Sequence, residues 1–281
     1  MKINNEIEIK VQNPKSRITF EKTGGGSWKI WDRFISIDKK KLYHIGNVCG
    51  TCEFFFIKQE ESLNIDFNKE ILISELNNGN LKFNSESVNK LSKLIPNGKY
   101  LVLETEINPQ LVTINSGNNY FTNEQREAWR YEEFDVEENE ELKFNNYFRE
   151  GLVDFGKLKY EHKHGFVNFF IPLYPIKELD NNRVEFYSNE IENGRKPVII
   201  SVGVLDVKTS EEYPEINGKE IEPEFGTHWC LANYIIDGHH KLMAASKSEK
   251  PIKLITFISR EESWQLIDEM KEEIKTAWNK V

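Results

Sequence analysis

The sequence predicts an α+β fold, with a β-rich N-terminal domain over about residues 1–175 and an α/β C-terminal domain over about residues 176–281. Three observations predict it. Short runs of alternating polar and apolar residues recur through the first third of the chain. Apolar runs separated by a polar turn and a helical segment occupy residues 197–258, and apolar residues at three- and four-residue steps close the chain. The length of 281 residues suits two ordinary domains or one large one.

The N-terminal half is expected to consist mainly of strands. Alternation predicts strands at residues 6–11, 17–20, 28–31 and 100–107, two strands around a cysteine-containing turn at 43–58, and a buried strand at 165–174. Helical spacing predicts helices at residues 85–94 and 122–129. The acidic run at residues 132–141 is interpreted as a solvated loop or helix face.

The C-terminal half is expected to alternate strands and helices after a linker at residues 179–182. The expected strands are residues 197–207, 228–236 and 252–258, and the expected helices are residues 242–247 and 260–280. The polar residues 210–225 are expected to form an insertion loop. In the last helix, Trp264, Ile267, Met270, Ile274 and Trp278 form one stripe, which predicts core packing.

Composition excludes several classes of protein. No apolar segment reaches membrane-spanning length, and the first ten residues contain no signal-peptide core. Three cysteines are an odd number, which disfavours a secreted disulfide framework and predicts a reducing, cytoplasmic location. The net charge of −9 disfavours nucleic-acid binding, because the field of the chain repels a polyanion.

The strongest candidate site is the turn Asp237-Gly238-His239-His240-Lys241, between an apolar strand and a helix. A helix that begins there points backbone N–H groups toward one place, which favours an anion. Gly238 allows close backbone approach, and the two histidines and the lysine add donors. Asp237 is a candidate general base or Mg²⁺ ligand. The alternative is structural: Asp237 caps the helix and the histidines satisfy buried carbonyl groups.

This turn, with Asn193-Gly194-Arg195-Lys196-Pro197-Val198 before the preceding strand and Ala244-Ala245 in the helix, resembles the ParB/sulfiredoxin-like superfamily. The resemblance covers roughly residues 190–258. It implies an α/β fold in which the turn holds phosphate, and it is shared by partition CTPases, sulfiredoxins, free-serine kinases and DNases.

Carried over by position, the resemblance implies that Gly238 and the amide of His239 cradle phosphate and that His240 is the family histidine. Lys241 stands where arginine is usual, which weakens bidentate gripping of phosphate. Residues 237–239 contain no cysteine, so sulfinic-acid reductase activity is rejected.

Cys49 and Cys52 form a C-x-x-C motif. A thioredoxin-like role is disfavoured because a strand pattern, rather than a helix, follows the motif. The pair suits a zinc knuckle that needs two more ligands, for which Cys230, His228 and His44 are the candidates. The alternative is three reduced, partly buried thiols.

The sequence therefore predicts a protein that binds a small phosphorylated ligand, a nucleotide with Mg²⁺, at the Asp237–Lys241 turn, with Asp237 and His240 catalytic in a phosphotransferase or nucleotide hydrolase. One alternative is a noncatalytic interaction protein with an inherited ParB-like scaffold, and a second is a ParB-like nuclease. The oligomeric state stays open.

Overall fold

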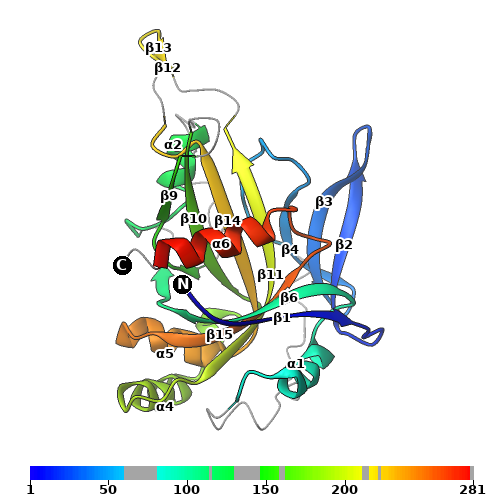
Figure 1. Cartoon of the computed structure of the whole chain (residues 1–281), viewed down its shortest axis with the longest axis vertical. Helices are drawn as coiled ribbons and strands as arrows, with labels where there is room; N and C mark the ends of the chain where they lie inside the picture. The colour runs from blue at the N-terminus through cyan, green and yellow to red at the C-terminus, as the bar shows by residue number, and fades with distance from the viewer. Residues whose placement is uncertain are drawn as a thin grey trace.

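A computed structural model describes residues 1–59, 81–113, 116–129, 146–157, 162–210, 215–220 and 223–278. These residues form a mixed α/β structure dominated by one nine-stranded sheet (Figure 1). Its strands lie in the order β1 (Lys2–Val11), β6 (Gly98–Ile107), β15 (Ile252–Ser259), β11 (Val198–Thr209), β14 (Thr227–Asp237), β10 (Lys163–Pro172), β8 (Tyr147–Arg149) and β7 (Gln110–Val112). The ninth, β9 (Val153–Lys157), pairs with β10.

Strands from both sides of the expected boundary at residue 175 share this sheet. The three strands β15, β11 and β14 come from the C-terminal part, and they lie between β6 and β10 from the N-terminal part. β6 pairs antiparallel with β15, so that Leu103 lies opposite Thr256. β10 runs parallel to β14, with Phe169 opposite Ala232. The two parts of the chain are therefore joined by continuous hydrogen bonding within one sheet.

A second sheet packs on one face of the large sheet. It contains β2 (Ile18–Gly25), β3 (Trp28–Ile37), β4 (Lys40–Asn47) and β5 (Ile57–Lys58). Ile35 and Tyr43 from this sheet belong to the same buried cluster as Val202 and Tyr234 from the large sheet. The Tyr43 hydroxyl donates to the Pro172 carbonyl at 3.0 Å. The largest hydrophobic core of the protein thus lies between the two sheets.

Helices cover the opposite face. α4 (Asn181–Glu192) and α5 (His239–Ser248) lie side by side at one end of the sheet, and α6 (Ile267–Trp278) crosses it nearer the other end (Figure 1). Alternation in β11 explains both layers: Ile199 packs with α4 and α5, and Leu205 packs with α6, whereas Val202 faces the second sheet.

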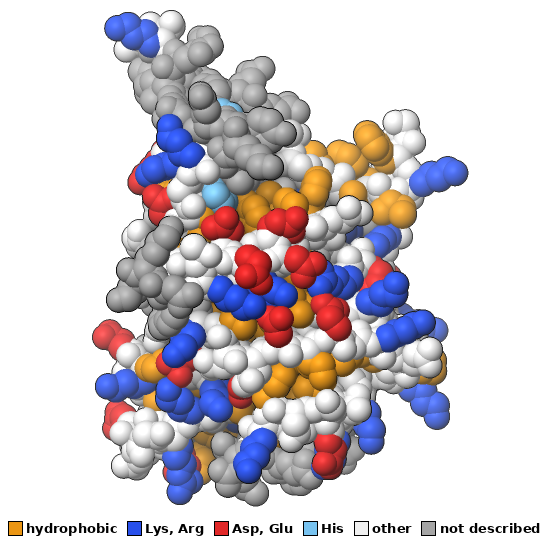
Figure 2. All heavy atoms as spheres, viewed as in Figure 1, with side chains coloured by type: hydrophobic (Ala, Val, Ile, Leu, Met, Phe, Trp, Pro, Cys, Tyr) orange, Lys and Arg blue, Asp and Glu red, His pale blue; other side chains and the backbone are white. Residues whose placement is uncertain are grey.

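Ion pairs connect α6 to the edge strand β1. Lys271 and Lys275 both pair with Glu6, and Arg260 bridges Glu8 and Asp268. Acidic and basic side chains are accordingly interspersed across this face of the molecule (Figure 2). The helix begins at Ile267, later than the spacing predicts, and Trp264 precedes it with 37% of its surface exposed.

Smaller elements complete the fold. They are α1 (Ser85–Leu91), α2 (Glu124–Trp129), the 3₁₀ helices η4 (Ser92–Leu94) and η5 (Ile176–Glu178), and the hairpin of β12 (Glu215–Ile216) and β13 (Lys219–Glu220). The hairpin lies within the expected insertion loop. None of the helices in the described part of the chain is long and apolar enough to cross a membrane. The acidic run at residues 132–141 lies outside the described residues.

The linker expected at residues 179–182 is wrong. Asp180 is the N-cap of α4, and its side chain accepts a hydrogen bond from the Asn182 amide at 2.9 Å. The polar Asp-Asn-Asn sequence is a helix start rather than a connection between domains.

Candidate functional site

The Asp237–Lys241 turn joins the end of β14 to the start of α5, as the sequence predicts. Gly238 is the N-cap of α5 and has left-handed backbone angles, φ 96° and ψ 23°. A Cβ at this position would lie 3.2 Å from the Cα of Ile199. Glycine is therefore required for both the backbone conformation and the close packing of the turn on β11.

Asp237 and Lys241 form a buried pair. The Lys241 Nζ lies 3.3 Å from the Asp237 carboxylate and donates to the Val198 carbonyl at 3.0 Å. The exposed fractions of the two residues are 7% and 2%. The ammonium also lies 5.7 Å from the centre of the Tyr187 ring. The pair joins α5 to β11 and α4, so its charges are used within the protein.

The two histidines of the turn bind a neighbouring segment of backbone. The Tyr174 amide donates to His239 Nε2 at 3.2 Å, and the Asp180 amide donates to His240 Nε2 at 3.1 Å. Burial lowers the pKa of His239 to about 4, so its imidazole is neutral near pH 7. An imidazole nitrogen that accepts a hydrogen bond cannot donate one to phosphate.

The polar side chains of the turn therefore have protein partners. They hold residues 174–180, α4 and β11 around the start of α5, rather than pointing together at one external position. Phosphate binding at Gly238, His239 and Lys241, and catalysis by Asp237 and His240, remain predictions.

The structure does not bring together the predicted zinc ligands. Cys49 and Cys52 are joined in a disulfide, whereas zinc requires thiolates. Cys230 and His228 lie on β14, and His44 pairs with Asp32 at 2.9 Å. Among the described residues, no group of three or more His, Cys, Asp or Glu side chains could hold a metal. These residues form a disulfide loop in the structure, and a zinc site there stays a prediction.

Cys230 and His228 belong to the core. The Tyr120 hydroxyl lies 2.7 Å from His228 Nδ1 and 3.5 Å from Cys230 Sγ, and His228 Nε2 lies 3.1 Å from the Phe225 carbonyl. Burial lowers the pKa of His228 to about 4 and raises that of Cys230. Both side chains are thus held neutral, as expected for groups that stabilise a core.

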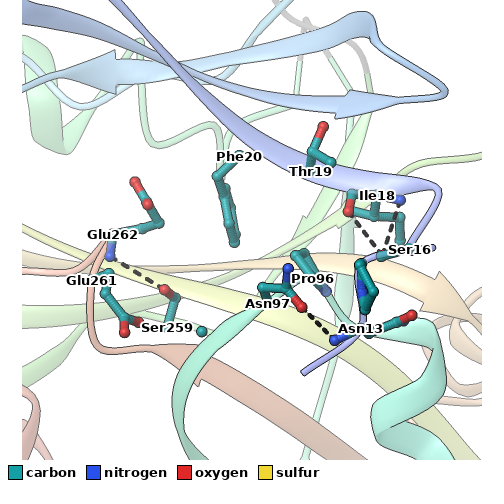
Figure 3. A pocket seen from close by; sticks show the side chains of 12 residues that line it. Asn13, Ser16, Ile18, Thr19, Phe20, Pro96, Asn97, Ser259, Glu261 and Glu262 are labelled. Carbon is teal, nitrogen blue, oxygen red and sulfur yellow. Dashed lines mark hydrogen bonds between the residues drawn. The ribbon is translucent and has the colours of Figure 1, made fainter. Parts of the chain in front are cut away.

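A pocket of about 380 Å³ lies away from the turn, where three distant segments meet (Figure 3). It is lined by residues from the stretches 13–20, 96–98 and 259–262, which follow or begin β1, β2, β6 and β15. The Phe20 side chain points into the space between the acidic residues and the turn at residues 96–98. No local motif marks this pocket, because each segment contributes only a few ordinary polar or apolar residues.

Two carboxylates stand on one side of the pocket. Both Glu261 oxygens accept hydrogen bonds from the Lys99 amide, at 3.0 and 2.9 Å. The Glu262 side chain is only 10% exposed, and its Oε2 lies 3.0 Å from Lys22 Nζ. The Glu262 carbonyl accepts from Arg33 at 2.7 Å, and its amide donates to the Ser259 hydroxyl at 3.2 Å. The acidic segment is therefore fixed by the surrounding structure.

The opposite side of the pocket is fixed by two asparagines. The Asn13 amide donates to the Asn97 side-chain oxygen, and Asn13 Nδ2 donates to the carbonyls of Lys93 and Ile95 at 2.7 and 3.2 Å. Pro96 lies beside them. The lining contains two carboxylates and no lysine or arginine, so the pocket has acidic character with partly apolar walls.

Comparison with known proteins found no relative of this chain: no family model, curated protein or solved structure matches it.

Proposed function

We propose that the protein is a noncatalytic binding protein whose pocket at Glu261 and Glu262 accepts a positively charged group, the amine or guanidinium of a small ligand or of a basic peptide side chain. The observation that carries the proposal is the lining itself: two carboxylates face a pocket that no lysine or arginine lines. Of the two, Glu262 already pairs with Lys22. Among the described residues, Glu261 has no lysine or arginine side chain at ion-pair distance, so its charge is available to a ligand.

The surroundings of the carboxylates favour a cation. The Lys99 backbone amide holds Glu261 in place, which reduces the entropy lost when a ligand binds. The Phe20 ring offers an aromatic face, to which cations are attracted. The net charge of −9 attracts positively charged ligands over longer distances.

The test is a calorimetric titration with the Nα-acetylated amides of arginine, lysine and citrulline, of which the citrulline amide carries no charge. We expect the two cationic probes to bind more tightly than citrulline amide. The variant Glu261→Gln should weaken cation binding about tenfold, the equivalent of about 1.4 kcal/mol. Its side-chain oxygen can still accept from the Lys99 amide, so the fold should be preserved.

The matched control is Glu185→Gln, which removes the same charge from an exposed position on α4. It should leave binding unchanged. Equal affinity for citrulline amide, or equal losses in the two variants, would show that the pocket does not select for a cation.

A phosphate-containing ligand at the start of α5 is a second candidate. It is favoured by left-handed Gly238, which starts a ten-residue helix at the end of β14 and directs its positive end toward the turn. Because the side chains of the turn have protein partners, this ligand would depend on the first backbone amides of α5. A rise in melting temperature with ATP and Mg²⁺ or with phosphate, kept in Glu261→Gln, would favour this candidate. No rise with either would remove it.

A further inference from the structure

The disulfide Cys49–Cys52 closes a four-residue loop between β4 and β5. Both cysteines are only half-buried, and Thr51 between them is exposed. A disulfide that closes so short a loop adds little to stability by restricting the unfolded chain, because that contribution grows with loop length. The position of the bond is therefore poorly explained by stabilisation alone.

Contacts other than the disulfide hold the loop in place. Its three consecutive carbonyls each accept a hydrogen bond: Cys49 from Lys208 Nζ at 2.6 Å, Gly50 from the Thr209 amide at 2.8 Å, and Thr51 from Trp129 Nε1 at 2.9 Å. None of these bonds involves sulfur. The loop can therefore keep its position when the two sulfurs are reduced.

The loop also lies against Trp264. A Cβ added at Gly50 would lie 3.2 Å from the Trp264 ring. Two tryptophans, Trp129 and Trp264, thus contact the loop from outside, and their fluorescence reports on its state.

The two sulfurs are not equivalent. The Cys52 amide donates to Cys49 Sγ at 3.0 Å, and the Thr51 hydroxyl lies 3.6 Å from the same sulfur. Hydrogen bonds to sulfur favour the thiolate form. The Lys208 ammonium, bonded to the Cys49 carbonyl, places a positive charge near the same residue. Cys49 is therefore the better leaving group when the disulfide is broken and the better nucleophile when it re-forms.

We propose that Cys49 and Cys52 form a reversible redox site that undergoes thiol–disulfide exchange with low-molecular-weight thiols. A thiolate attacks Cys52 Sγ, forming a mixed disulfide and releasing Cys49 as the thiolate. A second thiolate then attacks the small-molecule sulfur of the mixed disulfide, which yields the oxidised small disulfide and releases Cys52. The protein gains two electrons and the two thiols lose two. In the reverse direction, the small disulfide is the oxidant.

Cys230 provides an internal reference. It is 0% exposed and contacts the Tyr120 hydroxyl within the core. Its thiol should react with an alkylating reagent only after unfolding, so it takes no part in exchange.

The experiment equilibrates the native full chain in glutathione buffers of varied ratio, traps free thiols by rapid alkylation of the folded protein and counts the alkyl groups by mass. We expect one two-electron transition. A tenfold change in the ratio of squared reduced-glutathione concentration to oxidised-glutathione concentration should change the dithiol-to-disulfide ratio of the protein tenfold. Tryptophan fluorescence should follow the same transition, while Cys230 stays unmodified. A disulfide that stays oxidised in every glutathione buffer would overturn the proposal. So would one zinc ion per chain in the reduced protein, because the pair would then be a metal site.

Two single-cysteine variants test the difference between the sulfurs. In Cys52→Ser the residue 52 amide can still donate to Cys49, so that thiol should be alkylated faster at neutral pH than the Cys52 thiol in Cys49→Ser. The expected difference is about tenfold, because the hydrogen bonds to Cys49 favour its thiolate form. Equal rates would contradict the assignment of Cys49. The thiol count on the unmodified protein decides the redox proposal even where a serine variant folds poorly.

Discussion

Arg33 and Asp206 form a buried ion pair that joins the two sheets. Arg33 Nη2 on β3 lies 2.7 and 2.8 Å from the two carboxylate oxygens of Asp206 on β11. The exposed fractions of the two residues are 5% and 1%. The same guanidinium donates to the carbonyls of Gly46 and Glu262. This arginine therefore connects the core between the sheets to the acidic wall of the pocket.

Breaking this pair from one side should be costly. Arg33→Met leaves the Asp206 carboxylate buried without its partner, which should lower the free energy of unfolding by about 3–5 kcal/mol. Urea unfolding measures this decrease in the free energy of unfolding. The double variant Arg33→Met with Asp206→Leu should lose less than Arg33→Met alone, because no unpaired charge stays buried. If the losses of the two single variants simply add in the double variant, the two residues do not act as a pair.

The turn at Gly238 should resist even a small side chain. Gly238→Ala adds a Cβ at φ 96°, only 3.2 Å from Ile199, whereas Gly194→Ala adds one at φ 83° with no atom within 4 Å. In both variants the free energy of unfolding should fall by about 1 kcal/mol, because alanine disfavours left-handed backbone angles. The Gly238 variant should lose at least about twice as much, as measured by urea unfolding. Equal decreases in the free energy of unfolding would mean that the turn has space for a Cβ beside β11.

Stability should fall in acid because His228 is held neutral. Its pKa is about 4 in the folded protein and about 6.5 in the unfolded chain, so the unfolded state binds the extra proton between these values. The stabilisation is complete above about pH 6.5 and is lost as the pH falls toward 4. Around pH 5 the contribution to the slope is about 1.4 kcal/mol per pH unit.

The measurement is the free energy of unfolding across this pH range in the native chain and in His228→Gln, which cannot titrate. The variant should have a shallower slope, whatever it loses at neutral pH through the missing contact with Tyr120. Parallel slopes would show that His228 titrates alike in the folded and unfolded states.

Local pattern was enough to predict many elements of the fold. Apolar runs predict strands that the structure has at β6, β10, β11, β14 and β15, and the glycine after Asp237 marks the start of a helix. These features depend on neighbouring residues. The sharing of one sheet depends instead on which distant strands pair, as in Leu103 opposite Thr256, and no local pattern encodes that choice.

The candidate sites likewise depend on contacts between distant segments, which local sequence patterns do not predict. The partners of His239 and His240 are the backbone amides of Tyr174 and Asp180, and any residue except proline supplies such an amide. The pocket is assembled from segments far apart in the sequence, as the contact between Asn13 and Asn97, 84 residues apart, illustrates. Only the fold brings Glu261 and Phe20 into the lining of one pocket.

The most direct measurement of the central claim is a crystal structure of the protein with arginine amide bound. We expect the guanidinium to lie in the pocket within hydrogen-bond distance of the Glu261 carboxylate, beside Phe20. Density for the ligand at the start of α5 or along the charged surface of α6, with the pocket free of ligand, would contradict it.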